Sequence, residues 1–177
     1  MAINEKEKII LAKLIKKANN TQIKGDIWHE LVKKFVTVSI ELFITDKHNR
    51  VFMVYRKDRE FDGYHIPGVR INHWETVDQA CKRLIKNEIK PNGLKITKMV
   101  PIGWFGVQKD NNLKNKSYYR NPIQLIHTAH YDGEFIEKKD IGFFQLGALP
   151  KNTLECQKLL IKRFKNFLKD NQIVLGK

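Results

Sequence analysis

The hydrophobic pattern of this chain changes its period near residue 35, and that change limits the possible folds more than any other feature. Residues 3–18 place apolar side chains on one side of a helix and lysines on the other, and residues 27–34 predict a second short helix. Beyond them the spacing is that of strands. We therefore predict a helical extension over residues 1–35, whose apolar face docks on the domain or on a second subunit, and one main domain over residues 36–177.

Strand-like segments fill much of the main domain. "FVTVSIELFIT" and "RVFMVYR" flank the turn "DKHN", and this arrangement predicts a β-hairpin. Three further stretches have the composition of strands: residues 63–71, 94–107 and 121–131. The chain is thus expected to build a sheet of several short strands.

Two amphipathic helices accompany these strands. Residues 76–90 form the first, and residues 152–170 form the second, where Asn152 and Glu155 have the spacing of a capping box. Helices on both sides of a set of mixed strands are typical of an α/β sandwich, in which helices cover both faces of the sheet. The predicted fold class is therefore α/β (α+β).

One carboxylate lies on the apolar side of the first of these helices. At about 100° per residue, Glu88 falls near the middle of a stripe formed by Val77, Ala80, Cys81, Leu84, Ile85 and Ile89. Burying an ionised carboxylate is costly unless it is paired or binds a metal. Three explanations stay open: Glu88 lies at the edge of the stripe, it pairs with an arginine, or it faces a cation held beside the "HIPGV" turn.

The order of residues around this helix supports the third explanation. The turn at Pro67–Gly68 precedes Glu75 near the helix start, and Arg83 and Glu88 follow on the helix. This order resembles the Nudix box, a loop–helix–loop that holds divalent metal over a diphosphate. The resemblance extends over about residues 36–168 and implies a Nudix-type α/β/α sandwich with a mixed sheet.

The helix lacks several carboxylates of the usual box. Leu84 and Asn87 stand where the box has glutamates, Val69 stands in place of its second glycine and Lys90 in place of its closing one. What remains resembles the GDP-mannose mannosyl hydrolase branch, in which arginine–leucine replaces arginine–glutamate. That branch is dimeric and uses a magnesium ion while water attacks the anomeric carbon of a nucleoside diphosphate sugar. The resemblance therefore implies Mg²⁺ or Mn²⁺, such a sugar substrate and a homodimer.

The resemblance also assigns roles to individual residues. It implies three metal ligands: Gly68, Glu88 and Glu137. It implies three arginines in the substrate site, some of which grip the diphosphate: Arg56, Arg59 and Arg70. Arginine suits this task because its planar guanidinium forms two parallel hydrogen bonds. Arg83 takes the place of the catalytic arginine of the box.

The general base is less clearly assigned. Lys138 falls where the branch has its general-base histidine. An ordinary lysine is protonated at neutral pH and cannot accept a proton from water unless its pKa is strongly lowered. Either another residue serves as the base or catalysis is lost, and the candidates are His65, His73 and His127.

The charge of the chain favours anionic partners. Lys and Arg number 33 against 19 Asp and Glu, a net charge of +14, which suits phosphates, nucleotides or nucleic acid. Lysines that only solvate helix faces explain the same number equally well. No apolar run approaches the roughly 18 residues of a membrane span, and Cys81 and Cys156 lack metal-site spacing, so we predict a reduced, cytoplasmic protein.

Two functions compete on these residues. The first is an Mg²⁺-dependent hydrolase of a nucleoside diphosphate sugar, and the retained arginines and Glu88 favour it. The second is a catalytically weak or inactive protein that binds nucleotide or RNA, and the missing box glutamates and Lys138 favour it. An isopentenyl diphosphate isomerase shares part of the pattern but needs a reactive cysteine before the helix, which Pro67, Gly68 and Val69 do not offer.

Overall fold

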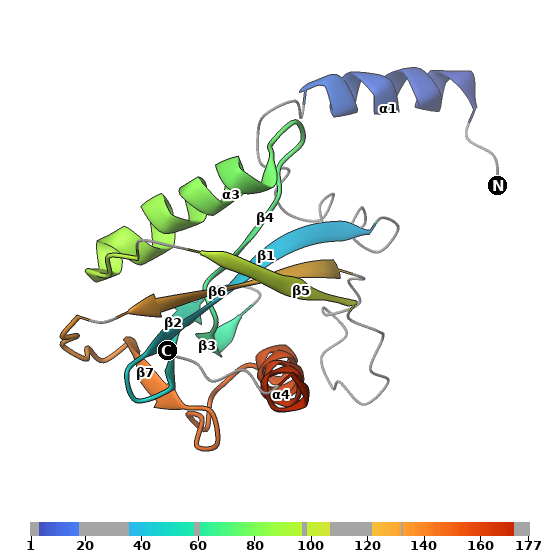
Figure 1. Cartoon of the computed structure of the whole chain (residues 1–177). Coiled ribbons are helices and arrows are strands. Elements are labelled where there is room, and N and C mark those ends of the chain that lie inside the picture. The colour runs from blue at the N-terminus through green and yellow to red at the C-terminus, as the bar shows by residue number, and fades with distance from the viewer. Residues whose placement is uncertain are drawn as a thin grey trace.

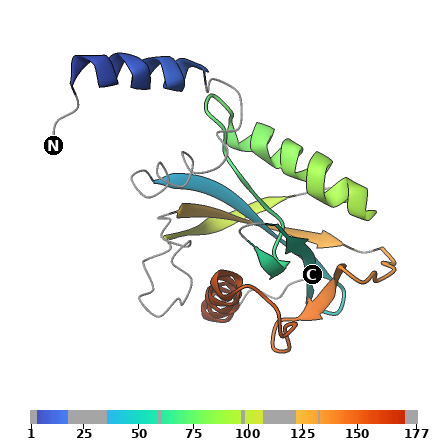
Figure 2. The same ribbon diagram turned by 180° about the vertical axis from the view of Figure 1, so that it is seen from behind.

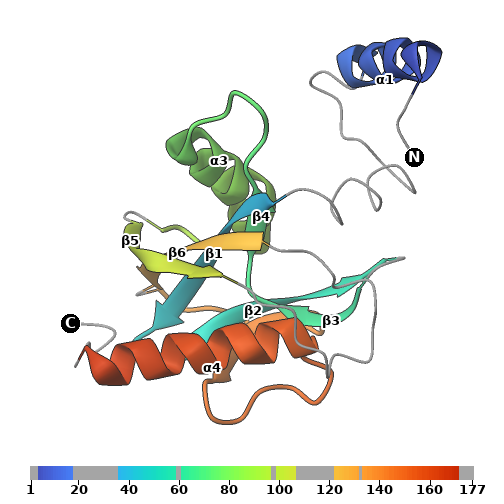
Figure 3. The same ribbon diagram turned by 90° about the vertical axis from the view of Figure 1, so that its right-hand side faces the viewer.

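The computed structural model of the chain describes residues 4–17, 36–58, 61–96, 99–106, 122–131 and 133–171. Seven strands form one mixed sheet, which has helix α3 on one face and helix α4 on the other (Figures 1 and 3). The predicted α/β sandwich with a mixed sheet is therefore confirmed.

The sheet is built around two central strands. Its strands are β1 (Thr37–Asp46), β2 (Arg50–Lys57), β3 (Asp62–His65), β4 (Gly68–Arg70), β5 (Val100–Gly106), β6 (Pro122–Tyr131) and β7 (Ile141–Gln145). Their order is β3-β2-β1-β6-β5, while β4 pairs with β1 and β7 pairs with β2. The pair β1–β6 is parallel and all others are antiparallel. The predicted hairpin is confirmed as β1–β2.

The N-terminal helix stands apart from this sandwich. Helix α1 (Glu5–Lys17) confirms the first predicted helix, and Figure 2 shows it away from the sheet. Its side chains Ile9, Ile10 and Leu11 are exposed. The second predicted helix lies outside the described residues, and the division of the chain at residue 35 stays a prediction. None of the described helices is long and apolar enough to cross a membrane.

Helix α3 (Val77–Leu84) ends earlier than the sequence predicts. Thr76 caps its start, because the Thr76 hydroxyl accepts from the Gln79 N–H and the Gln79 side chain accepts from the Thr76 N–H. After Leu84 the chain forms one π-helical turn, Ile85–Ile89, and then a short 3₁₀ turn, Lys90–Asn92. A π turn has one residue more per hydrogen-bonded ring than an α-helix and is frequent at functional sites. Glu88 lies in this turn.

Helix α4 (Glu155–Asp170) begins at Leu154, which makes no side-chain capping bond. The predicted capping box of Asn152 and Glu155 is therefore wrong. The Asn152 carbonyl instead accepts from the Tyr64 N–H at 3.0 Å, so this residue joins the helix entry to β3. The strand contact fixes the start of α4 where the sequence pattern suggested a local cap.

Two apolar layers hold the sandwich together, one on each face of the sheet. On the α3 face, Ile40, Leu42 and Phe52 pack with Leu84 and Ile89. On the other face, Phe43, Ile126 and Met53 pack with residues of α4, and the Phe43 and Phe164 rings stack at 3.8 Å. Successive β1 residues alternate between these layers, and this alternation decides where the polar residues of β1 lie.

Candidate active site

The Glu88 carboxylate faces the turn between β3 and β4. It is half-buried and accepts a hydrogen bond from the Gly68 N–H. Burial raises the pKa of Glu88, while the Gly68 N–H and the positive charges of Arg56 and Arg83 oppose that rise. The sequence places Glu88 on an apolar stripe. In the structure its carboxylate meets the Gly68 N–H and the positive charges of Arg56 and Arg83.

Arg83 is held by Glu75 in a bidentate ion pair. Its Nε and Nη2 donate to the two Glu75 carboxylate oxygens, each at 2.7 Å, and Nη2 also donates to the Arg70 carbonyl at 2.6 Å. The hydrogen bonds from Arg83 lower the pKa of Glu75, and the carboxylate in turn raises the pKa of Arg83. This pair fastens the helix to the loop after β4, so Arg83 positions the site.

A second carboxylate, Glu41 on β1, was not found by sequence reasoning. Glu41 is 8% exposed and accepts from the Ser39 hydroxyl at 3.1 Å and from Gln124 Nε2 at 3.2 Å. Burial raises its pKa to about 8, and the nearby charge of Glu88 adds to that rise, although hydrogen bonds from Ser39, Gln124 and Gln157 oppose it. Two carboxylates therefore share one buried region.

Gly68 separates these two carboxylates. Its N–H donates to Glu88, and a Cβ atom built on it would lie 2.5 Å from Glu41 Oε2 and 3.0 Å from the Ile40 carbonyl oxygen. The neighbouring Pro67 carbonyl accepts from the Leu42 N–H at 2.9 Å, which fixes the turn against β1. A side chain at position 68 would displace the Glu41 carboxylate.

We expect Gly68→Ala to destabilise the protein by about 1–3 kcal/mol, because overpacking at a fixed backbone forces neighbouring groups to shift. Chemical denaturation measures this change in the free energy of unfolding. Gly147→Ala is the matched control, since a Cβ at Gly147 meets no atom within 4 Å. Equal stability of the two variants would contradict the close approach of Gly68 to Glu41.

The oxygen atoms around Gly68 fit a divalent cation. Gln124 Oε1 is buried and has no hydrogen-bond partner in the described part of the chain, while Nε2 of the same side chain donates to Glu41. Carboxylate and carbonyl oxygens are the ligands that Mg²⁺ and Mn²⁺ prefer. Among the described residues no three His, Cys, Asp or Glu side chains converge. Mg²⁺ is commonly held by only one or two carboxylates, with water and substrate phosphates completing its shell.

His65 and Arg56 lie on the strands next to this site. Burial lowers the pKa of His65, and the Arg56 charge also lowers it. His65 Nδ1 lies 2.8 Å from the Ile66 carbonyl oxygen. A carbonyl only accepts, so Nδ1 carries the proton and Nε2 keeps a lone pair. His65 is therefore a neutral imidazole whose Nε2 can accept a hydrogen bond. The positive charge of Arg56 acts on the pKa of both His65 and Glu88.

Other predicted site residues lie elsewhere. Glu137 is exposed and pairs with Arg50 at 3.2 Å, and Arg50 lies six residues before Arg56 on β2, about 20 Å along a strand. The structure therefore does not bring Glu137 together with Glu88. Lys138 lies on an exposed turn, where its N–H donates to the Ile141 carbonyl at 3.1 Å.

Three more of the predicted site residues lie on β2, on β4 and on the loop after β4. His73 is exposed on the loop after β4, and its ring contacts Trp74 at 4.7 Å. Arg70 contributes its carbonyl to the Arg83 contact. Arg56 is exposed, pairs with Asp58 and lies over the Phe61 ring at 4.5 Å. Arg59 lies outside the described residues.

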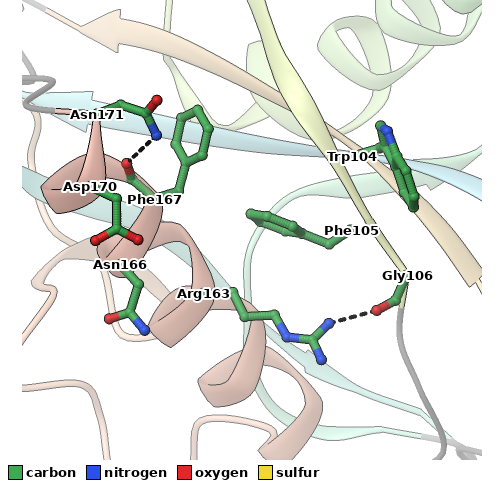
Figure 4. A pocket seen from close by; sticks show the side chains of 8 residues that line it. All are labelled: Trp104, Phe105, Gly106, Arg163, Asn166, Phe167, Asp170 and Asn171. Carbon is green, nitrogen blue, oxygen red and sulfur yellow. Dashed lines mark hydrogen bonds between the residues drawn. The ribbon is translucent and has the colours of Figure 1, made fainter.

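A groove lies on the face of the sheet that carries Glu41 and Gln124. Gln124 is the cross-strand partner of Ser39 on one side and of Phe105 on the other, so Phe105 lies about 10 Å from Ser39. From there a groove of about 610 Å³ opens between β5 and α4 (Figure 4), lined by Trp104, Phe105, Gly106, Arg163, Asn166, Phe167, Asp170 and Asn171. Arg163 closes one side by donating to the Gly106 carbonyl at 2.6 Å.

Solved structures with the same fold identify the architecture. A MutT Nudix hydrolase from Burkholderia pseudomallei is 18% identical, covers 73% of this chain and 98% of its own, and has a TM-score of 0.53. A Nudix hydrolase from Nitrosomonas europaea is 13% identical, with coverage of 75% and 90% and a TM-score of 0.53. An ADP-ribose pyrophosphatase from Streptococcus suis is 17% identical, with coverage of 76% and 91% and a TM-score of 0.50.

These similarities establish the fold and leave the substrate open. No family model matches the chain, and no curated protein matches it either. The chain has the Nudix hydrolase fold. Its resemblance to the GDP-mannose mannosyl hydrolase branch stays a prediction.

Proposed function

We propose that this protein, which has the Nudix hydrolase fold, hydrolyses a nucleoside diphosphate sugar with the help of Mg²⁺ or Mn²⁺. The observation that carries the proposal is the approach of two carboxylates, Glu41 and Glu88, to the Gly68 turn. Beside Glu41 lies Gln124, whose amide oxygen has no hydrogen-bond partner among the described residues. The charge of Glu88 adds to the rise in the pKa of Glu41, and a cation between the two carboxylates would remove this unfavourable interaction. The diphosphate is the part of the substrate that needs this cation.

Each residue near the turn has a defined task in this proposal. Glu41 and Glu88 hold the cation together with carbonyl or amide oxygens at Gly68 and Gln124. The cation, when bound, neutralises charge on the diphosphate leaving group. Arg56 is exposed and carries its guanidinium on β2 near Glu88, so it can bind phosphate oxygens. Arg83 keeps the helix in place through Glu75.

His65 is the best candidate for the general base. Its lowered pKa keeps the imidazole neutral at pH 7, and the Ile66 carbonyl fixes the proton on Nδ1. Nε2 can then accept a proton from the attacking water while that water bonds to the anomeric carbon. Lys138, by contrast, is exposed on a turn, and an exposed ammonium group stays protonated at neutral pH.

The groove between β5 and α4 suits the nucleoside end of the substrate. It lies on the same face of the sheet as Glu41, and Phe105 offers an aromatic side chain beside Gln124. Asn166 and Asn171 supply amide groups that both donate and accept hydrogen bonds. A diphosphate at Gly68 would therefore extend its nucleoside toward α4 and leave its sugar toward His65.

A panel of nucleoside diphosphate sugars incubated with Mg²⁺ tests the proposal. We expect free sugar and nucleoside diphosphate as products, since water attacks the anomeric carbon. Sugar phosphate and nucleoside monophosphate would show attack at phosphorus and would overturn the proposed site of attack. Chromatography of the products, with ¹⁸O-labelled water to locate the incoming oxygen, distinguishes the two.

The second candidate is a protein that binds nucleotide or nucleic acid without hydrolysis. Loss of box glutamates leaves two carboxylates at the turn, and the net charge of +14 favours anionic ligands. No turnover across the whole panel, combined with tight binding of nucleotide or RNA, would favour this candidate. In either case the exposed Ile9, Ile10 and Leu11 of α1 are the surface through which we propose a homodimer.

A further inference from the structure

A second hollow lies on the opposite face of the sheet from Glu41. It has a volume of about 640 Å³ and lies between α3 and the edge strand β5, with walls formed by Val77, Asp78, Cys81, Met99, Pro101, Ile102, Gly103, Trp104, Leu125 and His127. Leu125 packs with the α3 layer, and His127 follows two residues later on β6, so both side chains lie on that face. Among the described lining residues it shares only Trp104 with the groove between β5 and α4, and Glu41, Glu88 and Gly68 are not part of its walls.

His127 brings an unsatisfied polar group to the wall of this hollow. The residue is 6% exposed, and its Nδ1 has no hydrogen-bond partner in the part of the chain that the structure describes. A buried nitrogen without a partner is unfavourable. A ligand in the hollow can therefore supply the missing hydrogen bond.

Trp104 supplies a large flat surface at the mouth of the hollow. Its side chain is 68% exposed, and in Figure 4 its ring lies on the other side of β5 from Phe105. A β-bulge between Pro101 and Gly103 shifts the register of β5 beside it, and bulges re-aim side chains in this way. An exposed indole next to an apolar hollow is suited to stacking on a planar ring.

The charge of the lining separates this hollow from the rest of the protein. The chain carries a net charge of +14, yet the lining residues that the structure describes include the carboxylate of Asp78 and neither Lys nor Arg. Asp78 lies in the first turn of α3 and is exposed at the rim. A carboxylate without a nearby lining cation repels phosphate and accepts hydrogen bonds from N–H groups.

We propose that this hollow binds an uncharged nucleoside or nucleobase. The base stacks on Trp104, its polar edge bonds to His127 and Asp78, and its lack of phosphate matches the absence of basic residues among the lining residues described. The volume lies within the range of small-molecule sites, which are mostly apolar with a few converging polar groups. This proposal does not depend on hydrolysis at Gly68.

Titration calorimetry with adenosine, guanosine, cytidine and uridine, and with their 5′-monophosphates, tests this site in full-length protein with EDTA. We expect at least one nucleoside to bind, and its monophosphate to bind roughly tenfold more weakly. Trp104→Ala and His127→Phe should each weaken nucleoside binding roughly tenfold. Trp104 is exposed, so its variant keeps the fold even if His127→Phe does not. Glu88→Gln should leave this binding unchanged.

Asp78→Asn tests the charge argument separately. The variant keeps the size of an exposed side chain, so it should fold normally. The ratio of the affinity for the nucleoside to the affinity for its monophosphate should fall toward one. No binding by any nucleoside would overturn the proposal. Binding that neither His127→Phe nor Asp78→Asn changes would also overturn it, because Trp104 also lines the groove between β5 and α4 and a ligand in that groove would contact neither of these two residues. Neither result would bear on the hydrolysis proposed above.

Discussion

Replacing Glu88 by Gln is expected to lower kcat/KM by roughly 10²–10³-fold, the range seen when one strong electrostatic contact at a reacting centre is removed. Gln keeps the size of the side chain, and its Oε1 can still accept from the Gly68 N–H. Burial disfavours the charged form of Glu88 and so raises its pKa. The uncharged amide of Gln does not carry this cost. The variant should therefore fold at least as well as the wild type while losing a ligand for the cation.

Thermal melting separates this explanation from a general loss of structure. In the wild type, Mg²⁺ with GDP should raise the melting temperature, since a ligand at a hundred times its Kd stabilises by about 2.7 kcal/mol. In Glu88→Gln that rise should largely disappear. Glu155→Gln is the control, because Glu155 is an exposed carboxylate paired with Lys158 on α4. Full activity and an unchanged Mg²⁺ effect in Glu88→Gln would refute a metal role for Glu88.

The hydrophobic pattern was sufficient to predict most of the fold. The alternation in residues 36–58 and the helical spacing near both ends of the main domain led to the sandwich that the structure has. The end of α3 could not be predicted in this way, because residues 85–89 contain no Gly or Pro to mark the change from α-helix to the π turn Ile85–Ile89. The α4 capping box failed for a related reason, since a contact with Tyr64 on β3 determines the position of Asn152.

Of the two carboxylates at the candidate site, the sequence predicted only Glu88. Glu88 is recognisable because it interrupts an apolar stripe on a helix. Glu41 interrupts the apolar run "SIELF" in the same manner, but strand alternation makes a polar residue there unremarkable when one face of a sheet is taken to be solvated. Helix α4 covers that face, so Glu41 is buried. Its role depends on a helix more than 100 residues later in the chain, and no local pattern contains that information.

The placement of Glu137 and Lys138 shows the limit of residue-by-residue resemblance. In the sequence, a long polar segment at residues 107–121 separates both positions from the predicted box. The structure instead joins Glu137 to Arg50 and places Lys138 in the turn before β7. Arg83 shows the opposite case, because its partner Glu75 lies only eight residues earlier. The ion pair therefore joins two residues of the predicted box, while their roles in a reaction stay predictions.

Replacing Glu41 by Gln is expected to abolish turnover and, at the same time, to stabilise the protein without metal. The folded pKa of Glu41 is about 8, above the ordinary value of 4.5. Below pH 4.5 both states hold the proton, and ionisation changes nothing. As pH rises from 4.5 to 8 the unfolded chain loses the proton first, so the folded state becomes progressively less favoured. At pH 7 the wild type should thus be less stable than the variant by on the order of 3 kcal/mol.

Denaturation at pH 5 and at pH 8 measures this effect directly. The variant should gain little at pH 5 and most at pH 8, because Gln does not ionise while its Oε1 can still accept from Ser39 or Gln124. Mg²⁺ with GDP should narrow the difference at pH 8, since a cation favours the ionised carboxylate in the wild type and has no matching ligand in the variant. A stability difference that is the same at both pH values would contradict the buried, protonated carboxyl. A gain in stability accompanied by full activity would remove Glu41 from the cation site and leave Glu88 as its only acidic ligand among the described residues.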